Sequence, residues 1–469
     1  MSEEKKNDAN VKLSWRERIA YGTGDYAGNL IYSSISAFLL VYYTNVVGVS
    51  AAAAASIIGF SKILDGISDL IMGYIIDHTH TRIGKARPWI ARLCIPLAVC
   101  TVLMFTVPSG FAGSVQIAYM FLTYNLVSTI FYTGINVPYA AMNGLMTANQ
   151  YERGLLGNLR NLFATAGTMT VNTIVLKMTA FFGDGDKYSQ KGWTITVVFL
   201  MIAFVIINMF MFLNCKERVI DTAGDDEAEK EPKVPFMQQL KGMFRNKYWL
   251  MMVGIKFDMF FMMSFFFGTG VYYAQYILGN ADYYTPISNC LSMAQIATLC
   301  ITPFLMKKMT KRNLFLTGMS IAAIGFGLTG IMHGVTMISV LSVVKGIGFG
   351  FSGATMYGML QDAITYGEWQ EGYNNAGMGN AASSFCMKVG SGIGTAALGW
   401  VLQIGGFDKD AAIQSSSALT AIESSFAWIP MAAMIIAVVC GILFDLDKKY
   451  DKVIADLGEG KYKETSERF

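Results

Sequence analysis

Three charged side chains interrupt an otherwise apolar segment, SKILDGISDLIMGYIID. Lys62, Asp65 and Asp69 are spaced by three and four residues, so in a helix they share one face. One ionised residue at the centre of a membrane-spanning helix costs about 2.5–3.5 kcal/mol, so we expect all three to point away from lipid. Two carboxylates and one ammonium leave a negative cluster that a cation can neutralise, with Ser68 beside them. A buried ion pair that only joins helices is the alternative.

A second polar set lies in the apolar stretch FYTGINVPYAAMNG. Thr133 and Asn136 carry side-chain oxygens, and Pro138 frees a backbone carbonyl one turn earlier. These oxygens suit a hard cation or a sugar, and polar contact between helices is the alternative. The sequence predicts a cation site formed by Asp65, Asp69, Ser68, Thr133 and Asn136.

Sugar-binding chemistry is indicated at the start of the first apolar segment, YGTGDYAGNLIYSS. Asp25 and Asn29 are four residues apart and Tyr32 follows, which places a carboxylate, an amide and an aromatic ring near one helix face. Such groups bind sugar hydroxyls and stack on a sugar ring, although polar packing between helices is the alternative. Arg160 and Lys388 are cations in other apolar segments. For Arg160, snorkelling toward the interface is an equal alternative.

Helices in a membrane must position these side chains. The chain has 469 residues, of which 53% are hydrophobic and 15% charged, whereas about a quarter are charged in soluble proteins. A span takes about 20 apolar residues. We predict an all-α integral membrane protein with twelve transmembrane helices, at 20–45, 51–76, 89–108, 113–143, 157–182, 192–214, 248–278, 283–306, 313–332, 335–360, 377–404 and 420–444.

Basic residues set the predicted orientation. Lys and Arg concentrate in the N-terminal segment and in the loops after the even-numbered spans, so both termini are expected in the cytoplasm of a bacterial cell, with the spans in its inner membrane. The long charged loop at 215–247 divides the chain into two halves, as in transporters with a substrate site between two bundles. The predicted parts are a cytoplasmic segment 1–19, a six-helix bundle 20–214, a central loop 215–247, a second six-helix bundle 248–445 and a cytoplasmic tail 446–469.

The sequence lacks the residues that several other classes of protein need for their function. The net charge of +3 gives no reason to expect a nucleic-acid partner, and the seven cysteines show no C-x-x-C spacing. A Gly-rich phosphate loop, a dinucleotide turn and zinc spacing are absent. We therefore expect no enzymatic activity, no cofactor and no metal other than a coupling Na⁺. The expected partners are the lipid bilayer and a small sugar or glycoside, and we expect a monomer.

Six motifs in this order resemble the glycoside–pentoside–hexuronide:cation symporter family. They are YGTGDYAGN, YYTNVVGVSAAAA, KILDGISD, GYIIDHTHTRIGKARPWI, INVPYAAM and TYGEW, and the fourth is similar to the loop motif of the major facilitator superfamily. The resemblance implies a twelve-helix major facilitator fold and sugar symport driven by Na⁺ or H⁺. It also implies cation-binding roles for Asp65, Asp69 and Thr133, and sugar-site roles for Arg160 and Lys388.

This chain departs from the galactoside transporters of that family. Asn29 and Asn136 stand where those proteins have aspartates, and Ala140 replaces a tryptophan. A further tryptophan is missing near Gly353, where Tyr357 lies close by. These differences argue against a galactoside as substrate, and the G-D-x-x-x-N and N-x-P-Y combinations resemble the glucuronide and pentoside branches more. The predicted substrate-binding residues are Asp25, Asn29, Tyr32, Lys62, Asn136, Arg160, Tyr357 and Lys388.

Charged residues next to the predicted cytoplasmic loops suggest a gate. Its predicted members are Asp77, Arg82, Lys85, Arg87, Asp362 and Glu368. The expected function is cation-coupled symport of a glycoside, pentoside or glucuronide by alternating access. A major facilitator transporter of a lipid or drug-like solute, and a membrane sensor without transport, are the alternatives; the sugar and the choice of ion stay open.

Overall fold

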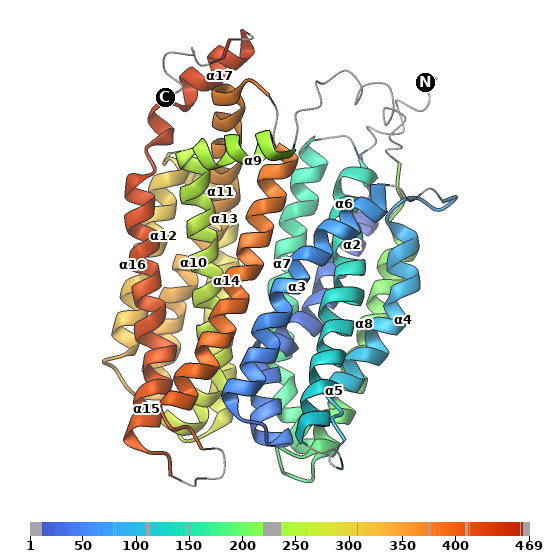
Figure 1. The fold of residues 1–469 in the computed structure, drawn as a ribbon, viewed down its shortest axis with the longest axis vertical. Helices are drawn as coiled ribbons and strands as arrows, with labels where there is room; N and C mark the ends of the chain where they lie inside the picture. Colours follow the sequence, from blue (N-terminus) through green and yellow to red (C-terminus); the bar gives the residue numbers. More distant parts are fainter. Residues whose placement is uncertain are drawn as a thin grey trace. The chain divides into compact units, whose positions relative to one another are not determined.

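The computed structural model describes residues 12–77, 79, 81–108, 110, 113–147, 150–218, 236–306, 308–373, 376–408, 411, 413–459 and 461–462. Every regular element in these ranges is helical, as Figure 1 shows. Up to residue 214 the elements are α2 (Trp15–Ser34), η1 (Ile35–Leu39), η2 (Tyr42–Val47), α3 (Ala51–Asp77), α4 (Arg87–Met104), α5 (Gly113–Asn125), η3 (Leu126–Tyr132), α6 (Thr133–Met146), α7 (Gln150–Phe182) and α8 (Gln190–Asn214).

The later elements begin with a short amphipathic helix. They are α9 (Phe236–Arg245), α10 (Lys247–Tyr272), η4 (Tyr273–Ile277), η5 (Ala281–Tyr283), α11 (Tyr284–Leu305), α12 (Lys311–Thr329), α13 (Val335–Glu371), α14 (Ala376–Ile404), α15 (Ser416–Glu423), η6 (Ser424–Trp428), α16 (Ile429–Leu443), η7 (Leu446–Lys448) and α17 (Tyr450–Gly458).

Each of the twelve predicted spans corresponds to a long helix in the described part of the chain. Some of these helices contain π-helical turns: η3 joins α5 to α6, η4 extends α10, and η6 joins α15 to α16. Eight of the long helices are apolar and long enough to cross a membrane by composition alone. The other four, α2, α7, α11 and α12, carry more polar side chains.

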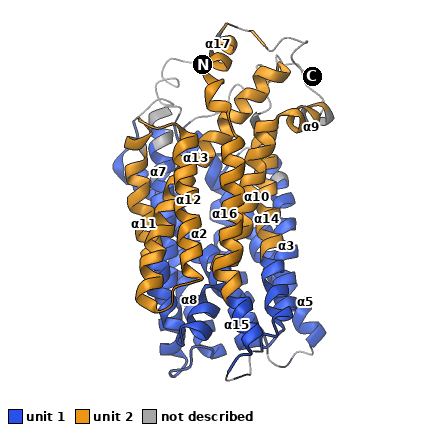
Figure 2. Cartoon of the chain, turned by 90° about the vertical axis from the view of Figure 1, so that its left-hand side faces the viewer, with its two compact units in different colours: residues 1–222, 267–289, 395–422 blue, residues 223–266, 290–394, 423–469 orange. Residues whose placement is uncertain are grey.

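The chain forms two compact units, coloured separately in Figure 2. Unit 1 comprises residues 1–222, 267–289 and 395–422, and unit 2 comprises residues 223–266, 290–394 and 423–469. Unit 1 therefore includes two segments that follow the central loop. The predicted division into bundles 20–214 and 248–445 stays a prediction.

In unit 1, α2 packs against α7 and α8, while α3 packs against η3 and α6. The start of α2 is defined by a capping box, because Ser14 and Glu17 satisfy each other's backbone N–H groups. An aromatic core fills one part of the unit, with the rings of Phe105 and Trp193 stacked at 5.8 Å and Tyr42 packed on both.

In unit 2, α12 packs against α13 and α16. The rings of Phe266, Phe326 and Phe426 form its core, and the buried ammonium of Lys345 lies 5.0 Å from the centroid of each. A cation over aromatic faces is attracted by the ring quadrupole.

Candidate functional site

Asp65 is the most enclosed of the predicted cation-binding carboxylates, with 7% of its surface exposed. Its Oδ2 accepts a hydrogen bond from Ser128 at 2.5 Å, and its Oδ1 accepts one from Thr129 at 2.5 Å. Both donors come from η3, which packs against α3. Both oxygens of the carboxylate are therefore held by hydroxyl groups of one neighbouring helical turn.

Asp69 lies one turn farther along α3 and contacts the same partner helix. Its Oδ1 accepts a hydrogen bond from Thr133 at 3.0 Å. The hydroxyl of Ser68 lies 2.9 Å from the backbone oxygen of Asp65 and 3.2 Å from Thr133 Oγ1. The structure therefore brings together four of the five predicted cation ligands. In each of them the side-chain atom that would bind a cation is an oxygen.

The backbone of the partner helix explains this concentration of oxygen atoms. The π-helical turn η3 ends at Tyr132, immediately before Thr133, and Pro138 lies inside α6. A π-helical turn shifts the hydrogen-bonding register, and Pro138 lacks the N–H that would bond the carbonyl four residues earlier. Such local irregularities are tolerated at membrane depth where the backbone faces protein or a polar cavity.

Asn136 and Lys62 have different surroundings from the cluster around Asp65. Asn136 lines a small pocket with Asp25, Tyr132 and Asn208, which places it with predicted sugar-site residues. The Lys62 ammonium donates to Thr395 Oγ1 at 3.1 Å, in a later segment that also belongs to unit 1. Lys62 is also electrostatically coupled to Asp65 on its own helix.

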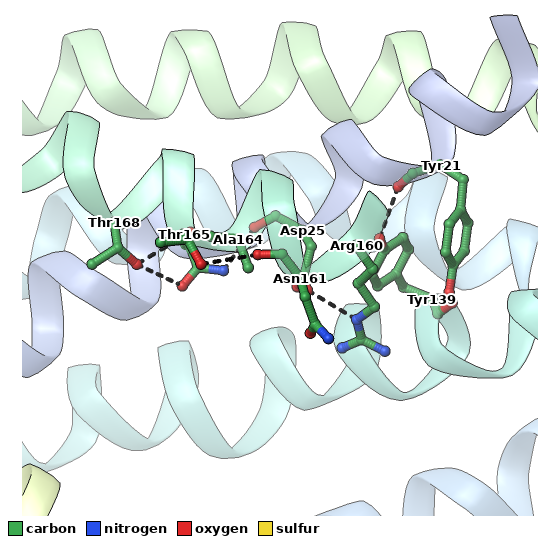
Figure 3. Close-up of polar contacts among 9 residues, drawn as sticks. Tyr21, Asp25, Tyr139, Arg160, Asn161, Ala164, Thr165 and Thr168 are labelled. Carbon is green, nitrogen blue, oxygen red and sulfur yellow. Dashed lines mark hydrogen bonds and ion pairs between the residues drawn. The ribbon is translucent and has the colours of Figure 1, made fainter. Parts of the chain in front are cut away.

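Asp25 and Arg160 form an ion pair between α2 and α7 (Figure 3). Arg160 Nε donates to Asp25 Oδ2 at 2.9 Å, and the guanidinium carbon lies 5.0 Å from the ring centroid of Tyr139. Gly24 allows that ring to approach α2, because a Cβ at this position would lie 2.6 Å from Tyr139. The terminal nitrogens of Arg160 lie on the side of the guanidinium away from Asp25.

Asn29 and Tyr32 lie on the same helix as Asp25. The Asn29 amide donates to the backbone oxygen of Asp25 at 2.8 Å and accepts from Thr168 at 3.3 Å. Tyr32 stacks on Tyr132 with a centroid distance of 6.4 Å and is 42% exposed. Unit 1 therefore contains a carboxylate, a guanidinium, amides and accessible aromatic rings, which are groups that hydrogen-bond hydroxyls and stack on sugar rings.

The remaining predicted substrate residues, Tyr357 and Lys388, lie in unit 2. Tyr357 is 52% exposed, and the buried Lys256 ammonium lies 4.5 Å from its ring centroid. Lys388 is half-buried on α14. Their roles in substrate binding stay predictions.

The predicted gate residues have other partners where the structure describes them. The backbone N–H groups of Lys85 and Arg87 donate to Glu217 at 2.7 and 2.9 Å, and Gly84, with φ of 119°, lets this carboxylate approach. Asp362 accepts two hydrogen bonds from Lys311, at 2.8 and 2.7 Å. Arg82 is exposed and Glu368 half-buried, whereas the side chain of Asp77 lies outside the described residues. The gate stays a prediction.

Ser128 and Thr129 are the site residues that sequence reasoning missed. Hydroxyl residues in apolar helices commonly bond to their own helix backbone, as Thr101 does to Leu97 at 2.8 Å. No α-helical spacing relates both residues to Thr133, because only the π-helical register of η3 brings Ser128 and Thr129 to the same carboxylate.

The comparisons with known proteins agree with this architecture. The sequence model of the family described as MFS/sugar transport protein matches residues 20–448. The D-xylose-proton symporter has a similar fold, with a TM-score of 0.63 at 13% identity over 92% of this chain and 96% of that one. The fold is therefore that of the major facilitator transporters, and the protein is a multi-pass membrane protein.

Curated relatives are similar along nearly the whole chain. The isoprimeverose transporter of Lactiplantibacillus pentosus is 33% identical, with 95% of this chain and 91% of that protein covered. The glucuronide carrier protein homolog of Escherichia coli (strain K12) is 25% identical, with 96% and 97% covered. The chain belongs to the MFS/sugar transport protein family, and its resemblance to the glycoside–pentoside–hexuronide:cation symporters is confirmed.

Proposed function

We propose that this protein carries out symport of an uncharged glycoside or pentoside with a cation, H⁺ or Na⁺, across the bacterial inner membrane. The observation that carries this proposal is the oxygen cluster around Asp65 and Asp69 in unit 1. Hard monovalent cations bind oxygen ligands, and a proton can bind either carboxylate. Among the described residues no three His, Cys, Asp or Glu side chains gather to hold a metal ion, so hydroxyl oxygens would complete a Na⁺ site.

The preference for an uncharged sugar rests on the pairing of Arg160. Its charge is balanced by Asp25 at 2.9 Å, so the pair offers a hydrogen-bond acceptor and donors without an excess of positive charge. Sugar hydroxyls both donate and accept, and they match such a pair. The relative named for isoprimeverose is also more similar to this chain than the glucuronide carrier homolog.

Ion coupling follows from the cost of charge inside the membrane. An ion bound at Asp65 and Asp69 neutralises part of the cluster, and the loaded protein then reorients more cheaply than one with an exposed charge. The ion gradient drives sugar uptake through this linkage. We further propose that both termini are cytoplasmic, because the basic residues concentrate on their side of the chain, and that the protein has no enzymatic activity and needs no cofactor.

Uptake into membrane vesicles tests the proposed function. Isoprimeverose, a xyloside, a galactoside and a glucuronide are supplied under separate Na⁺ and proton gradients. We expect isoprimeverose or the xyloside to accumulate under one of the gradients and the glucuronide not to do so. Accumulation of the glucuronide alone overturns the preference for an uncharged sugar, and accumulation of no sugar under either gradient overturns the proposal.

A further inference from the structure

Unit 1 contains contacts between segments that are far apart in the sequence. Residues 267–289 and 395–422 pack with helices of residues 1–222. At the rim of these contacts, Lys187, in the turn between α7 and α8, reaches η5. Its ammonium donates to Asp282 at 2.7 Å and to Asn280 at 3.2 Å. Trp193 holds the turn in place by donating to the Lys187 backbone oxygen at 3.0 Å.

Neutral hydrogen bonds also join the same parts of the chain, and two of them connect side chains at 2.8 Å or less. The hydroxyls of Thr44 and Tyr272 lie 2.7 Å apart, and both residues are 1% exposed. The Asn289 amide donates to Thr173 at 2.8 Å. Together with the Lys187 contacts, these two bonds form what we call the interlock: each joins a residue before position 222 to one after position 267.

The members of the interlock differ in how easily they separate. The ion pair is accessible to water, with side-chain exposures of 24% for Lys187 and 45% for Asp282, so water can replace its partners at little cost. The buried hydroxyls of Thr44 and Tyr272 can separate only if water or another partner reaches them. The accessible ion pair is therefore the part of the interlock that separates most easily, and it adds a modest stabilisation to the closed contact while it is formed.

Helix α3, which carries the cation cluster, contacts the other late segment of unit 1, residues 395–422. Trp400 donates to Ser56 at 3.1 Å and Lys62 donates to Thr395 at 3.1 Å. Gly399 lies so close to α3 that a Cβ there would be 2.1 Å from the Cβ of Ala55. Asp65 lies less than one turn beyond Lys62, so the cluster and these contacts share one helix.

We propose that the interlock closes the substrate path at the end beside the turn between α7 and α8. The Lys187–Asp282 pair is its latch, which means the contact whose loss allows the interlock to open. This inference rests on the proposed transport function, since alternating access requires each end of the path to open in turn. Loss of the latch shifts the population toward the state in which the interlock is open, because the closed state alone contains the ion pair.

Thiol labelling of the purified full-length protein tests the latch without measuring transport. Thr44→Cys places a thiol at the buried part of the interlock, and the protein with native Thr44 gives the background from its own cysteines. In the Thr44→Cys protein, adding Lys187→Glu is expected to raise the rate at which maleimide labels the introduced thiol by about fivefold, as loss of an ion pair allows. Adding Lys191→Glu instead is the matched control, because Lys191 pairs with Asp184 in the same turn, with exposures of 62% and 84%.

Charge reversal separates a latch from general damage to the turn. Lys187→Glu and Asp282→Lys are combined in the Thr44→Cys protein, which restores an ion pair with the charges exchanged. The labelling rate is then expected to return to within about twofold of the rate of the Thr44→Cys protein. Slow labelling in the Lys187→Glu protein, or fast labelling that persists after charge reversal, overturns the latch. Because labelling needs no sugar, a failure here is distinguishable from a failure of the vesicle uptake experiment.

Discussion

Ser128 Oγ lies 2.5 Å from Asp65 Oδ2, a contact between a π-helical turn and the charged face of α3. Thr129 from the same turn contacts the other oxygen of the carboxylate at 2.5 Å. The cluster therefore depends on a backbone irregularity that aims two consecutive hydroxyls at one carboxylate.

Ser128→Ala and Thr129→Val are expected to weaken ion coupling. Each removes a hydroxyl oxygen that would ligate Na⁺ beside Asp65, and a polar contact to a charged group contributes about 1.5–3 kcal/mol. With Na⁺ as the coupling ion, we expect the ion concentration for half-maximal uptake to rise roughly tenfold, since about 1.4 kcal/mol corresponds to that factor. Sugar uptake measured against ion concentration checks this, with Thr101→Val as control because its hydroxyl bonds to its own helix. Equal ion dependence in all three variants would contradict the assignment.

Arg160→Gln is expected to reduce both stability and sugar binding. It leaves Asp25 with an unpaired charge, and breaking a buried pair in this way costs about 3 kcal/mol. A second change, Asp25→Asn, is expected to restore the melting temperature but not sugar binding, because the donor for sugar hydroxyls is still absent. Thermal unfolding and equilibrium binding distinguish the two effects. Recovery of binding in the double variant would show that the pair has only a structural role.

Arg18 and Glu152 are expected to act as a structural pair. Arg18 donates to Glu152 through two nitrogens, at 2.9 and 2.6 Å, and the side chains are 5% and 2% exposed. Glu152→Gln is expected to destabilise the protein by about 3–5 kcal/mol, while replacing both residues by Met recovers most of that loss. Chemical unfolding of the purified protein measures the difference. A double variant as unstable as Glu152→Gln would indicate that the two residues do not act as a pair.

The contact between Glu17 and Arg218 is expected to make stability depend on pH. Burial alone raises the pKa of Glu17, but the hydrogen bond from Arg218 and those from Ser14 outweigh it and lower the pKa below the ordinary 4.5. A lowered pKa in the folded state stabilises the protein above pH 4.5, and this contribution is lost as the pH falls through the folded-state pKa.

Arg218→Gln removes the main cause of the lowered pKa. The fall in melting temperature between pH 6 and pH 4 should therefore be smaller than in the native protein, with Lys191→Gln as the control at an exposed pair. An unchanged pH profile would argue that this contact does not stabilise the fold.

Hydropathy and charge predicted the membrane helices well, because a spanning helix must be long and apolar whatever it contacts. The same reasoning predicted that Asp65 and Asp69 share a face away from lipid, and both contact hydroxyl groups of the neighbouring segment 128–133; their role in cation binding stays a prediction. It assigned Asn136 to both the cation site and the sugar site, and the structure shows Asn136 at the pocket beside Asp25; both roles stay predictions.

The contributions of Ser128 and Thr129 could not be read from periodicity. They depend on the π-helical register of η3, and a change from four-residue to five-residue bonding leaves no mark in an apolar sequence. The partner of Lys187 was equally inaccessible to sequence reasoning, because Asp282 is 95 positions away and only the packing of the segments in unit 1 brings the two together.

The most direct test of ion coupling compares two kinds of sugar transport by one variant in proteoliposomes. Asp65→Asn is expected to abolish accumulation of the sugar against its gradient under an imposed ion gradient. Sugar exchange at equal ion concentrations should persist, because Asp25 and Arg160 are unchanged. Accumulation equal to that of the native protein would contradict a coupling role for the cluster around Asp65.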